Sequence, residues 1–315
     1  MSESDVRNRK KIDRVISDEG STANRSQVTP RFGALPTFPY QRVWTRVVLV
    51  VCASVVVYFS SSKGKETVFA SQRDVFQKRG LNIPCSDSYQ FELSKFKGCT
   101  PKVCGRLVSD AIITSEEADT LINLAKTGIA LGGSDGGASI LDLHSGALSH
   151  GQNFVNFFKL PEATNILKPE DYITYNMVKN KIQDAIAEHF GIQAKYLHLT
   201  YPTFFSRLTS IPPKTVHDEY WHKHVDKETY EAFHYTSLLY LNDFKKDFTG
   251  GRFAFVNADN TTAIIEPRKG RVSMFTSGAE NPHYVERVAT GVRYAVTVSF
   301  TCDPTKAIAD IRPPA

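Results

Sequence analysis

Hydrophobic and polar positions divide this chain into three parts. Residues 1–46 are polar, rich in Ser, Arg, Lys and Asn, and follow neither a helical nor a strand period. An uncharged stretch follows from Val47 to Ser62, and beyond it apolar positions recur first at about 3.6 residues and then, from Leu197, at 2 residues. This pattern predicts a disordered tail, one membrane-spanning segment, a helical region and a strand-rich region, in that order.

The uncharged stretch is long enough to anchor the chain in a membrane. Its sixteen residues rise only ~24 Å as a helix against a hydrocarbon core of ~30 Å. Arg46 and Lys63 can snorkel to the two interfaces, and Trp44 and Tyr58 lie near the edges, where amphipathic rings prefer to be. We predict a transmembrane signal anchor over residues 43–62 and a cytoplasmic tail over residues 1–42.

Two other interpretations of this stretch agree less well with its flanks. A buried strand or core helix would need a folded domain around it, and the polar residues 1–46 offer none. A cleaved signal peptide should follow a short charged leader, whereas 46 residues precede the apolar run.

The orientation of the anchor rests on cysteines and a glycosylation signal. The local charge count does not favour a cytoplasmic N-terminus, because the twenty residues before the stretch carry three Lys or Arg and the twenty residues from Lys63 onward carry five. Downstream lie four cysteines with no Cys-x-x-Cys pair and the sequon Asn260-Thr-Thr, which suit disulfides and N-glycosylation. We predict a single-pass type II membrane protein of the endoplasmic reticulum or Golgi, with a lumenal C-terminal part, glycosylated at Asn260. The disulfide candidates, whose pairing stays open, are Cys85, Cys99, Cys104 and Cys302.

The first half of the lumenal part is predicted to be helical. We expect a charged stem over residues 63–84 and a Cys-containing, helical support region over residues 85–196. Thr114 and Glu117 form a capping box at the start of one helix. A longer helix begins at Pro169, and Gly191 suits its C′ position.

The second half is predicted to be a β-domain over residues 197–302, followed by a C-terminal tail over residues 303–315. Seven short strand-like runs with turns between them favour a sandwich, jelly roll or barrel. Helices followed by strands indicate an α+β fold in which helices buttress a sheet. The runs are residues 197–208, 235–241, 252–256, 263–266, 271–276, 283–288 and 293–300.

Composition removes several function classes. Among 315 residues the net charge is only +5, 41% are hydrophobic and 23% are charged, which argues against a nucleic-acid binder and against a disordered or fibrous protein. The membrane, through the single anchor, and an unknown protein or small-molecule substrate are therefore the partners we expect.

One cluster of residues indicates metal chemistry. His224 and Asp226 are i and i+2, on one side of an extended segment, and His283 follows 57 residues beyond Asp226, near a strand start. Two imidazoles and one carboxylate leave three positions open on an octahedral metal, as in non-haem Fe(II) oxygenases. The open positions suit a 2-oxo acid and O2, and Arg293 is placed to bind the far carboxylate of such an acid. His222, also i+2-related to His224, remains a rival ligand.

These residues and their neighbours resemble the prolyl-hydroxylase-like Fe(II)- and 2-oxoglutarate-dependent dioxygenases. The resemblance implies a double-stranded β-helix (jelly roll), iron bound by His224, Asp226 and His283, and 2-oxoglutarate held by Arg293 with help from Tyr240 and Thr297. Collagen-type members usually have Lys where this chain has Arg293, which weakens inference from their substrates. The motifs that carry the resemblance are His224-x-Asp226, Tyr240-Leu-Asn242, Gly250-Gly251, Glu266-Pro267, Gly270-Arg271, Phe275, His283 and Arg293-Tyr-Ala-Val-Thr297.

The sequence therefore predicts a membrane-anchored oxidoreductase that hydroxylates a peptidyl or other C–H substrate and releases succinate and CO2. Its expected cofactors are Fe(II), 2-oxoglutarate, O2 and L-ascorbate. One alternative is a non-catalytic lumenal binding module with the same fold, and another is a cupin that uses Zn or Mn without 2-oxoglutarate. Arg293 argues against the cupin, which has no matched anion-binding arginine.

Overall fold

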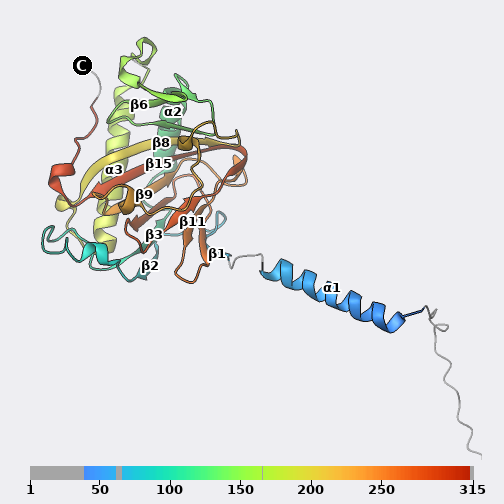
Figure 1. Ribbon diagram of the computed structural model, residues 1–315. Coiled ribbons are helices and arrows are strands. Elements are labelled where there is room, and N and C mark those ends of the chain that lie inside the picture. Colours follow the sequence, from blue (N-terminus) through green and yellow to red (C-terminus); the bar gives the residue numbers. More distant parts are fainter. Residues whose placement is uncertain (1–38, 62–65, 165, 313–315) are drawn as a thin grey trace, which may run out of the picture. The chain divides into compact units, whose positions relative to one another are not determined.

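The computed structural model describes residues 39–61, 66–164 and 166–312 and divides the chain into two units, residues 1–60 and 61–315. The first contains the helix α1 (Gln41–Ser61), drawn in blue in Figure 1. Its side chains from Val43 to Tyr58 lie outside any protein core, and it is the one described helix that is long and apolar enough to cross a membrane. This part of the sequence prediction is confirmed as far as length and composition go.

The second unit is built on two sheets. The large sheet has the strand order β2-β3-β13-β9-β15-β8-β5-β6-β4, with β10 on β15 and β7 on β6, and the small sheet has the order β1-β12-β11-β14. The large sheet comprises β2 (Arg79–Ile83), β3 (Cys104–Ser109), β4 (Gly133–Ser134), β5 (Ala138–Leu141), β6 (Ala147–Gly151), β7 (Asn153–Asn156), β8 (His198–Thr209), β9 (Tyr235–Tyr240), β10 (Phe248–Gly250), β13 (Val272–Thr276) and β15 (Val288–Thr301). The small sheet comprises β1 (Glu66–Ala70), β11 (Phe253–Val256), β12 (Thr262–Ile265) and β14 (His283–Val285).

Helices complete the regular secondary structure of this unit. The α-helices are α2 (Ser115–Ile129), α3 (Pro169–Phe190) and the short α4 (Asp226–Thr229). The 3-10 turns are η1 (Asp87–Tyr89), η2 (Phe157–Lys159), η3 (Pro161–Ala163), η4 (Ala194–Tyr196), η5 (Val216–Asp218) and η6 (Pro304–Lys306). Thr114 caps α2 in the predicted box with Glu117, and Gly191 ends α3 in the left-handed conformation (φ 65°), so both helix signals are confirmed.

The strand pairing is that of a double-stranded β-helix. Antiparallel pairs run β13-β9-β15-β8 on the large sheet. On the small sheet, antiparallel pairs run β12-β11-β14, and β14 continues to His224 through an isolated antiparallel bridge. From β12 to β15, consecutive strands therefore alternate between the two sheets, as in a jelly roll, and the predicted α+β fold is confirmed.

Alternation along β15 separates two cores. Val296 and Val298 point outward, where α2 and α3 cover the large sheet (Figure 1), and they share a buried cluster with Leu121 of α2 and Ile182 of α3. A second cluster fills the space between the two sheets, and its members are Ala70, Val108, Leu238, Tyr240, Phe253, Phe255, Ala263, Ile265 and Phe275. Because strand side chains alternate, residues 293, 295, 297 and 299 share the inner face.

The predicted stem and the two predicted tails can be compared with the structure only where their residues are described. The predicted stem, residues 63–84, is wrong for residues 66–83, because β1 pairs with β12 and β2 pairs with β3. The predicted tail, residues 303–315, packs on the domain over its described part: Ile311 is buried, and Asn176 of α3 donates to its carbonyl. The predicted N-terminal tail, residues 1–42, lies outside the described residues except at 39–42.

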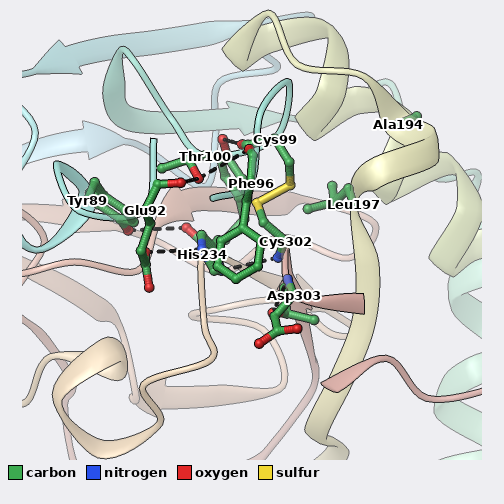
Figure 2. The surroundings of a disulfide bond; sticks show 12 residues. Tyr89, Glu92, Phe96, Cys99, Thr100, Ala194, Leu197, His234, Cys302 and Asp303 are labelled. Atoms are coloured by element: carbon green, nitrogen blue, oxygen red, sulfur yellow. Dashed lines mark hydrogen bonds and ion pairs between the residues drawn. A yellow bond between two sulfur atoms is a disulfide. The ribbon is translucent and has the colours of Figure 1, made fainter. Parts of the chain in front are cut away.

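Two disulfides hold the segment that precedes β3. The structure joins Cys85 to Cys104 and Cys99 to Cys302, and leaves Cys52 of α1 free. Figure 2 shows the second of these beside the buried His234, whose Nδ1 accepts from the backbone N–H of Cys302 at 3.1 Å. Since four of the five cysteines pair, the fold suits an oxidising compartment.

A charged network continues from this disulfide toward the β-domain. His234 Nε2 and Lys227 Nζ lie 3.2 and 3.0 Å from Glu92 Oε2. Burial alone would raise the pKa of Glu92, but the adjacent His234 and Lys227 outweigh it and hold the pKa below its usual value. The Glu92 carboxylate therefore links the disulfide-bonded segment to the residue that follows Asp226.

Candidate metal and cosubstrate site

The three residues predicted as metal ligands lie together at the end of the small sheet. Candidate ligand atoms of His224, Asp226 and His283 all lie within 4.8 Å of one another. Each histidine Nε2 is 3.6 Å from Asp226 Oδ1. The backbones of the two histidines exchange a pair of 3.0 Å hydrogen bonds, which sets the rings side by side with centroids 4.4 Å apart.

Hydrogen bonds orient both imidazoles toward a common point. His224 Nδ1 lies 2.9 Å from the carbonyl of His222, and His283 Nδ1 lies 2.9 Å from the carbonyl of Asn281. A carbonyl only accepts, so each Nδ1 is the donor and each Nε2 keeps its lone pair for a metal. Burial lowers the pKa of His283, with the charge of Asp226 opposing it, which favours the neutral, ligating form.

The carboxylate is oriented from behind. Asp226 opens the short helix α4, and Thr236 of β9 donates to its Oδ2 at 2.6 Å. Thr236 is itself 2.9 Å from the hydroxyl of Ser277. Oδ2 is therefore engaged with the protein, and Oδ1 faces the two imidazoles.

Aromatic rings close the buried side of the triad. His283 stacks on Phe253, with centroids 5.1 Å apart, and meets Phe275 edge-on at 4.9 Å. These rings belong to the core between the sheets. His224, by contrast, is 44% exposed on its side chain, so the cluster is walled on one side and open on the other.

Arg293 lies inside the jelly roll without a carboxylate partner among the described residues. It is 1% exposed, and its Nε and Nη2 have no hydrogen-bond partner. Its Cζ lies 5.4 Å from the centroid of the Tyr240 ring. Burial lowers the pKa of Arg293, although arginine stays charged in proteins, so the site holds a buried cation that lacks an anion.

Arg271, a second buried arginine, shows by contrast how a buried guanidinium is paired in this fold. Arg271 is equally buried, yet it forms a two-pronged ion pair with Asp110 at 2.8 and 2.9 Å and donates to several backbone carbonyls. Buried charges are normally paired in this way. The unpartnered Arg293 is therefore suited to bind a carboxylate that enters the fold.

The other predicted site residues are placed as follows. Thr297 lies on the same face of β15 as Arg293, opposite Leu238 of β9. His222 turns away from the cluster: its Nε2 is 2.6 Å from Glu219 Oε2, and only its carbonyl serves His224. Asn260 is exposed in the turn between β11 and β12, in the left-handed conformation (φ 60°).

Tyr220, in the loop between β8 and α4, is a further residue close to Arg293. Its hydroxyl accepts from the Val288 N–H at 3.0 Å and donates to the Thr209 carbonyl at 3.3 Å. Burial raises its pKa, while the Val288 N–H and the nearby charge of Arg293 act in the opposite direction. Tyr220 therefore forms part of the wall around the buried guanidinium, which no local sequence pattern indicates.

Comparison with known proteins agrees with this geometry. The model of the 2OG-Fe(II) oxygenase superfamily matches residues 214–301, which include the whole triad and Arg293. Over 245 residues the chain is 53% identical to 2-oxoglutarate and iron-dependent oxygenase domain-containing protein 3 of Xenopus tropicalis, covering 77% of each chain. The chain belongs to the 2OG-Fe(II) oxygenase superfamily. The resemblance expected from its motifs is confirmed.

Two further relatives place the chain within the superfamily. It is 49% identical to the Mus musculus protein of the same name, over 93% of this chain and 95% of the relative. It is 31% identical to prolyl 3-hydroxylase 1 of Gallus gallus over 63% of this chain but only 29% of that longer protein.

The donor set fits the cofactors of the superfamily. Two neutral imidazoles and one carboxylate suit Fe(II) with open positions, and the unpartnered Arg293 suits the distal carboxylate of 2-oxoglutarate.

Proposed function

We propose that this protein is a membrane-anchored dioxygenase that hydroxylates a peptidyl C–H bond in the secretory lumen. The observation that carries the proposal is the pairing of the His224–Asp226–His283 cluster with a buried, unpartnered arginine in one jelly roll. The relationship to prolyl 3-hydroxylase 1 supports a peptidyl substrate. L-Ascorbate is the reductant we expect the enzyme to need.

Each residue has a definite task in this proposal. His224 and His283 would hold Fe(II) through Nε2, and Asp226 through Oδ1, while Thr236 keeps the carboxylate in place. Arg293 would bind the distal carboxylate of 2-oxoglutarate, beside Tyr240 and with Thr297 on the same strand face. When bound, iron and 2-oxoglutarate supply oxidative decarboxylation with O2, which yields succinate, CO2 and one oxygen atom for the substrate C–H bond.

The aromatic wall has a task of its own. Phe253, Phe255 and Phe275 are each no more than 1% exposed and pack around His283. They exclude water from the buried side of the metal, which limits side reactions of an oxidising centre. The exposed edge at His224 is then the side on which a substrate can approach.

The test uses iron and 2-oxoglutarate directly. The full chain is loaded with Fe(II) and 2-oxoglutarate without O2, the metal-to-ligand charge-transfer absorption is recorded, and succinate is measured after O2 is admitted. We expect Asp226→Ala to lose both signals, and Glu228→Ala, an exposed carboxylate on the same short helix, to keep both. Succinate formation by Asp226→Ala at normal iron loading would refute the assignment, and absorption without succinate would favour a binding module.

The location is a separate part of the proposal. We propose that α1 is a type II signal anchor and that residues 61–315 lie in the lumen of the endoplasmic reticulum or Golgi. The two disulfides and the exposed position of Asn260 support it. In microsomes, we expect the lumenal unit to resist added protease and Asn260→Gln to abolish a glycosidase-sensitive mass shift. Digestion of the lumenal unit in intact vesicles would reverse the orientation.

A further inference from the structure

A cleft of about 920 Å³ adjoins the candidate metal site. Lys223 and Pro282, which immediately precede His224 and His283, belong to its lining. Leu81 and Ile83 of β2 are apolar members of the lining, and Asn257, Asp87 and Glu280 are polar ones. The volume is at the upper end of the range usual for ligand pockets, so the cleft can hold more than a small cosubstrate.

Arg106 of β3 also lines this cleft, although only 1% of its surface is exposed. Its Nε donates to Asn281 Oδ1 at 2.7 Å and its Nη1 donates to Asn257 Oδ1 at 2.8 Å. Both amides are fixed in turn, because Asn281 Nδ2 donates to the Thr276 carbonyl at 2.8 Å and Asn257 Nδ2 donates to Thr261 at 2.9 Å. The guanidinium is therefore held rigidly.

The neighbours that hold Arg106 are neutral. Its Cζ lies 4.1 Å from the centroid of the Phe255 ring, and that ring lies 6.1 Å from the ring of His283. Within the described residues it forms no ion pair, and Nη2 makes no hydrogen bond. Among the fully buried arginines of the described residues, Arg271 pairs with Asp110, whereas Arg106 and Arg293 form no ion pair with a carboxylate.

Burying the charged guanidinium of Arg106 without an ion-pair partner costs free energy. Burial lowers the pKa of Arg106 to about 10, and the charge of Glu280 opposes this. A charge placed so deeply is usually compensated by an anion. Arg293 has one in the proposed cosubstrate. The carboxylate that acts on Arg106, that of Glu280, accepts hydrogen bonds from Ser86 and Thr276 instead and forms no ion pair with the guanidinium.

The cleft also borders a free strand edge. β2 ends the large sheet and pairs only with β3 among the described strands. Leu81 is 42% exposed and lies directly opposite Arg106 in the β2–β3 register. A free edge can pair with an extended polypeptide, whose alternate side chains would then point into the cleft.

We propose that Arg106 is a substrate-recognition residue that binds a carboxylate side chain of an extended polypeptide lying in this cleft. The acidic residue would sit near the residue whose C–H bond faces the metal. This inference rests on the proposed function, which supplies the peptidyl substrate, and adds to it a preference for acidic peptides.

The experiment measures peptide binding by the full chain. Immobilised protein with Fe(II) and 2-oxoglutarate, kept without O2, is exposed to pools of extended peptides with one Asp or Glu and to matched pools with Asn or Gln. A charge-assisted hydrogen bond corresponds to a factor of about 10 to 100, so we expect the acidic pools to bind at least about tenfold more tightly. Arg106→Gln should remove this preference and keep the charge-transfer absorption.

Two further variants separate recognition from folding and from general charge. Leu81→Glu places a carboxylate opposite Arg106 from an exposed position, and it should remove the preference even if Arg106→Gln fails to fold. Lys223→Ala removes an exposed charge at the cleft and should keep the preference.

Three results would overturn the inference: equal binding of the two pools by the wild type, an unchanged preference in Leu81→Glu, or loss of the preference in Lys223→Ala to the same extent. Binding is measured independently of turnover. Absence of the charge-transfer absorption and of succinate would therefore count against the proposed function, separately from the preference for acidic peptides.

Discussion

Arg271 and Arg293 are both buried, but replacing each with methionine should have opposite effects on stability. Arg271→Met should destabilise the fold, and Arg293→Met should stabilise it. Arg271 pairs with Asp110 and reaches the carbonyls of Ala70 and Ser71 at 3.3 and 3.0 Å. Arg293 is just as buried, but two of its guanidinium nitrogens have no partner. The first arginine stabilises the fold, and the second destabilises it in preparation for a ligand.

The magnitudes follow from what each substitution leaves behind. Arg271→Met strands the buried Asp110, which should cost about 3–5 kcal/mol. Arg293→Met removes a buried charge that has no counterion, and should raise the free energy of unfolding by about 1–4 kcal/mol. For a domain of this size each kcal/mol shifts Tm by about 2–4 °C.

The assay is thermal unfolding of the full chain in detergent without iron or 2-oxoglutarate. Tm should rise in Arg293→Met and fall in Arg271→Met. A titration of the charge-transfer absorption should show 2-oxoglutarate affinity reduced about 100-fold in Arg293→Met, since two charge-assisted hydrogen bonds of ~1.5 kcal/mol each are lost. Arg293→Lys, which keeps the charge, should not gain stability.

Two results would refute this reasoning. A fall in Tm for Arg293→Met comparable to that for Arg271→Met would mean that Arg293 is paired within the protein. An unchanged 2-oxoglutarate titration would remove its role as the carboxylate receptor.

Two other predictions concern the surroundings of the triad. Thr236→Val removes the 2.6 Å hydrogen bond to Asp226. Iron affinity, measured against a competing chelator, should then fall by about 10- to 100-fold. Thr249→Val, on an exposed strand edge, is the control and should leave iron affinity unchanged. The pKa of Glu92 is lower in the folded protein than in the unfolded chain. The ionised carboxylate therefore contributes its full stabilisation at a pH above the unfolded-state pKa, and this stabilisation is lost as the pH falls through the folded-state pKa. Between pH 5 and pH 3, the urea midpoint of unfolding should therefore fall less steeply with pH in Glu92→Gln than in the wild type. Equal slopes would contradict a stabilising role for Glu92 in its network with His234 and Lys227.

The strands that carry the site could be predicted because their pattern is local. The runs at residues 271–276 and 293–300 correspond to β13 (Val272–Thr276) and the centre of β15 (Val288–Thr301). In each, alternate residues face the helices and the interior, so the period of 2 is visible in the sequence. The spacing of His224 and Asp226 was informative for the same reason, since i and i+2 residues share a face, whereas His283 was recognised from its place near a strand start and from the resemblance.

The residues that were missed depend on partners far away in the sequence. Arg106 lies in a short run, Cys104–Ser109, in which every residue is buried. An arginine in such a run is a weak local signal, because only the three-dimensional structure shows that this arginine lacks an ion-pair partner among the described residues. Tyr220 likewise gains its role only when β8, β15 and its own loop meet.

The stem prediction was wrong for the same reason, because the partner of β1 lies far away in the sequence. β1 is five residues long and pairs in parallel with β12, which is almost 200 residues further along the chain. Its neighbours complete the Arg271 site, because Arg271 Nη2 donates to the Asp74 carbonyl at 2.8 Å and the Phe76 N–H donates to Asp110 at 2.8 Å.

Starting the chain at residue 85 would delete all of these groups together with β1 and β2. The remaining protein would contain Arg271 and Asp110 with several hydrogen bonds unmade, and the outer edges of β12 and β3 would be exposed, which favours aggregation. We therefore expect residues 66–315 to elute as a compact, protease-resistant species in size-exclusion chromatography and residues 85–315 to aggregate. A folded, monomeric 85–315 protein with normal 2-oxoglutarate binding would show that residues 66–84 are a stem after all, because a stem contributes no contacts that the domain needs.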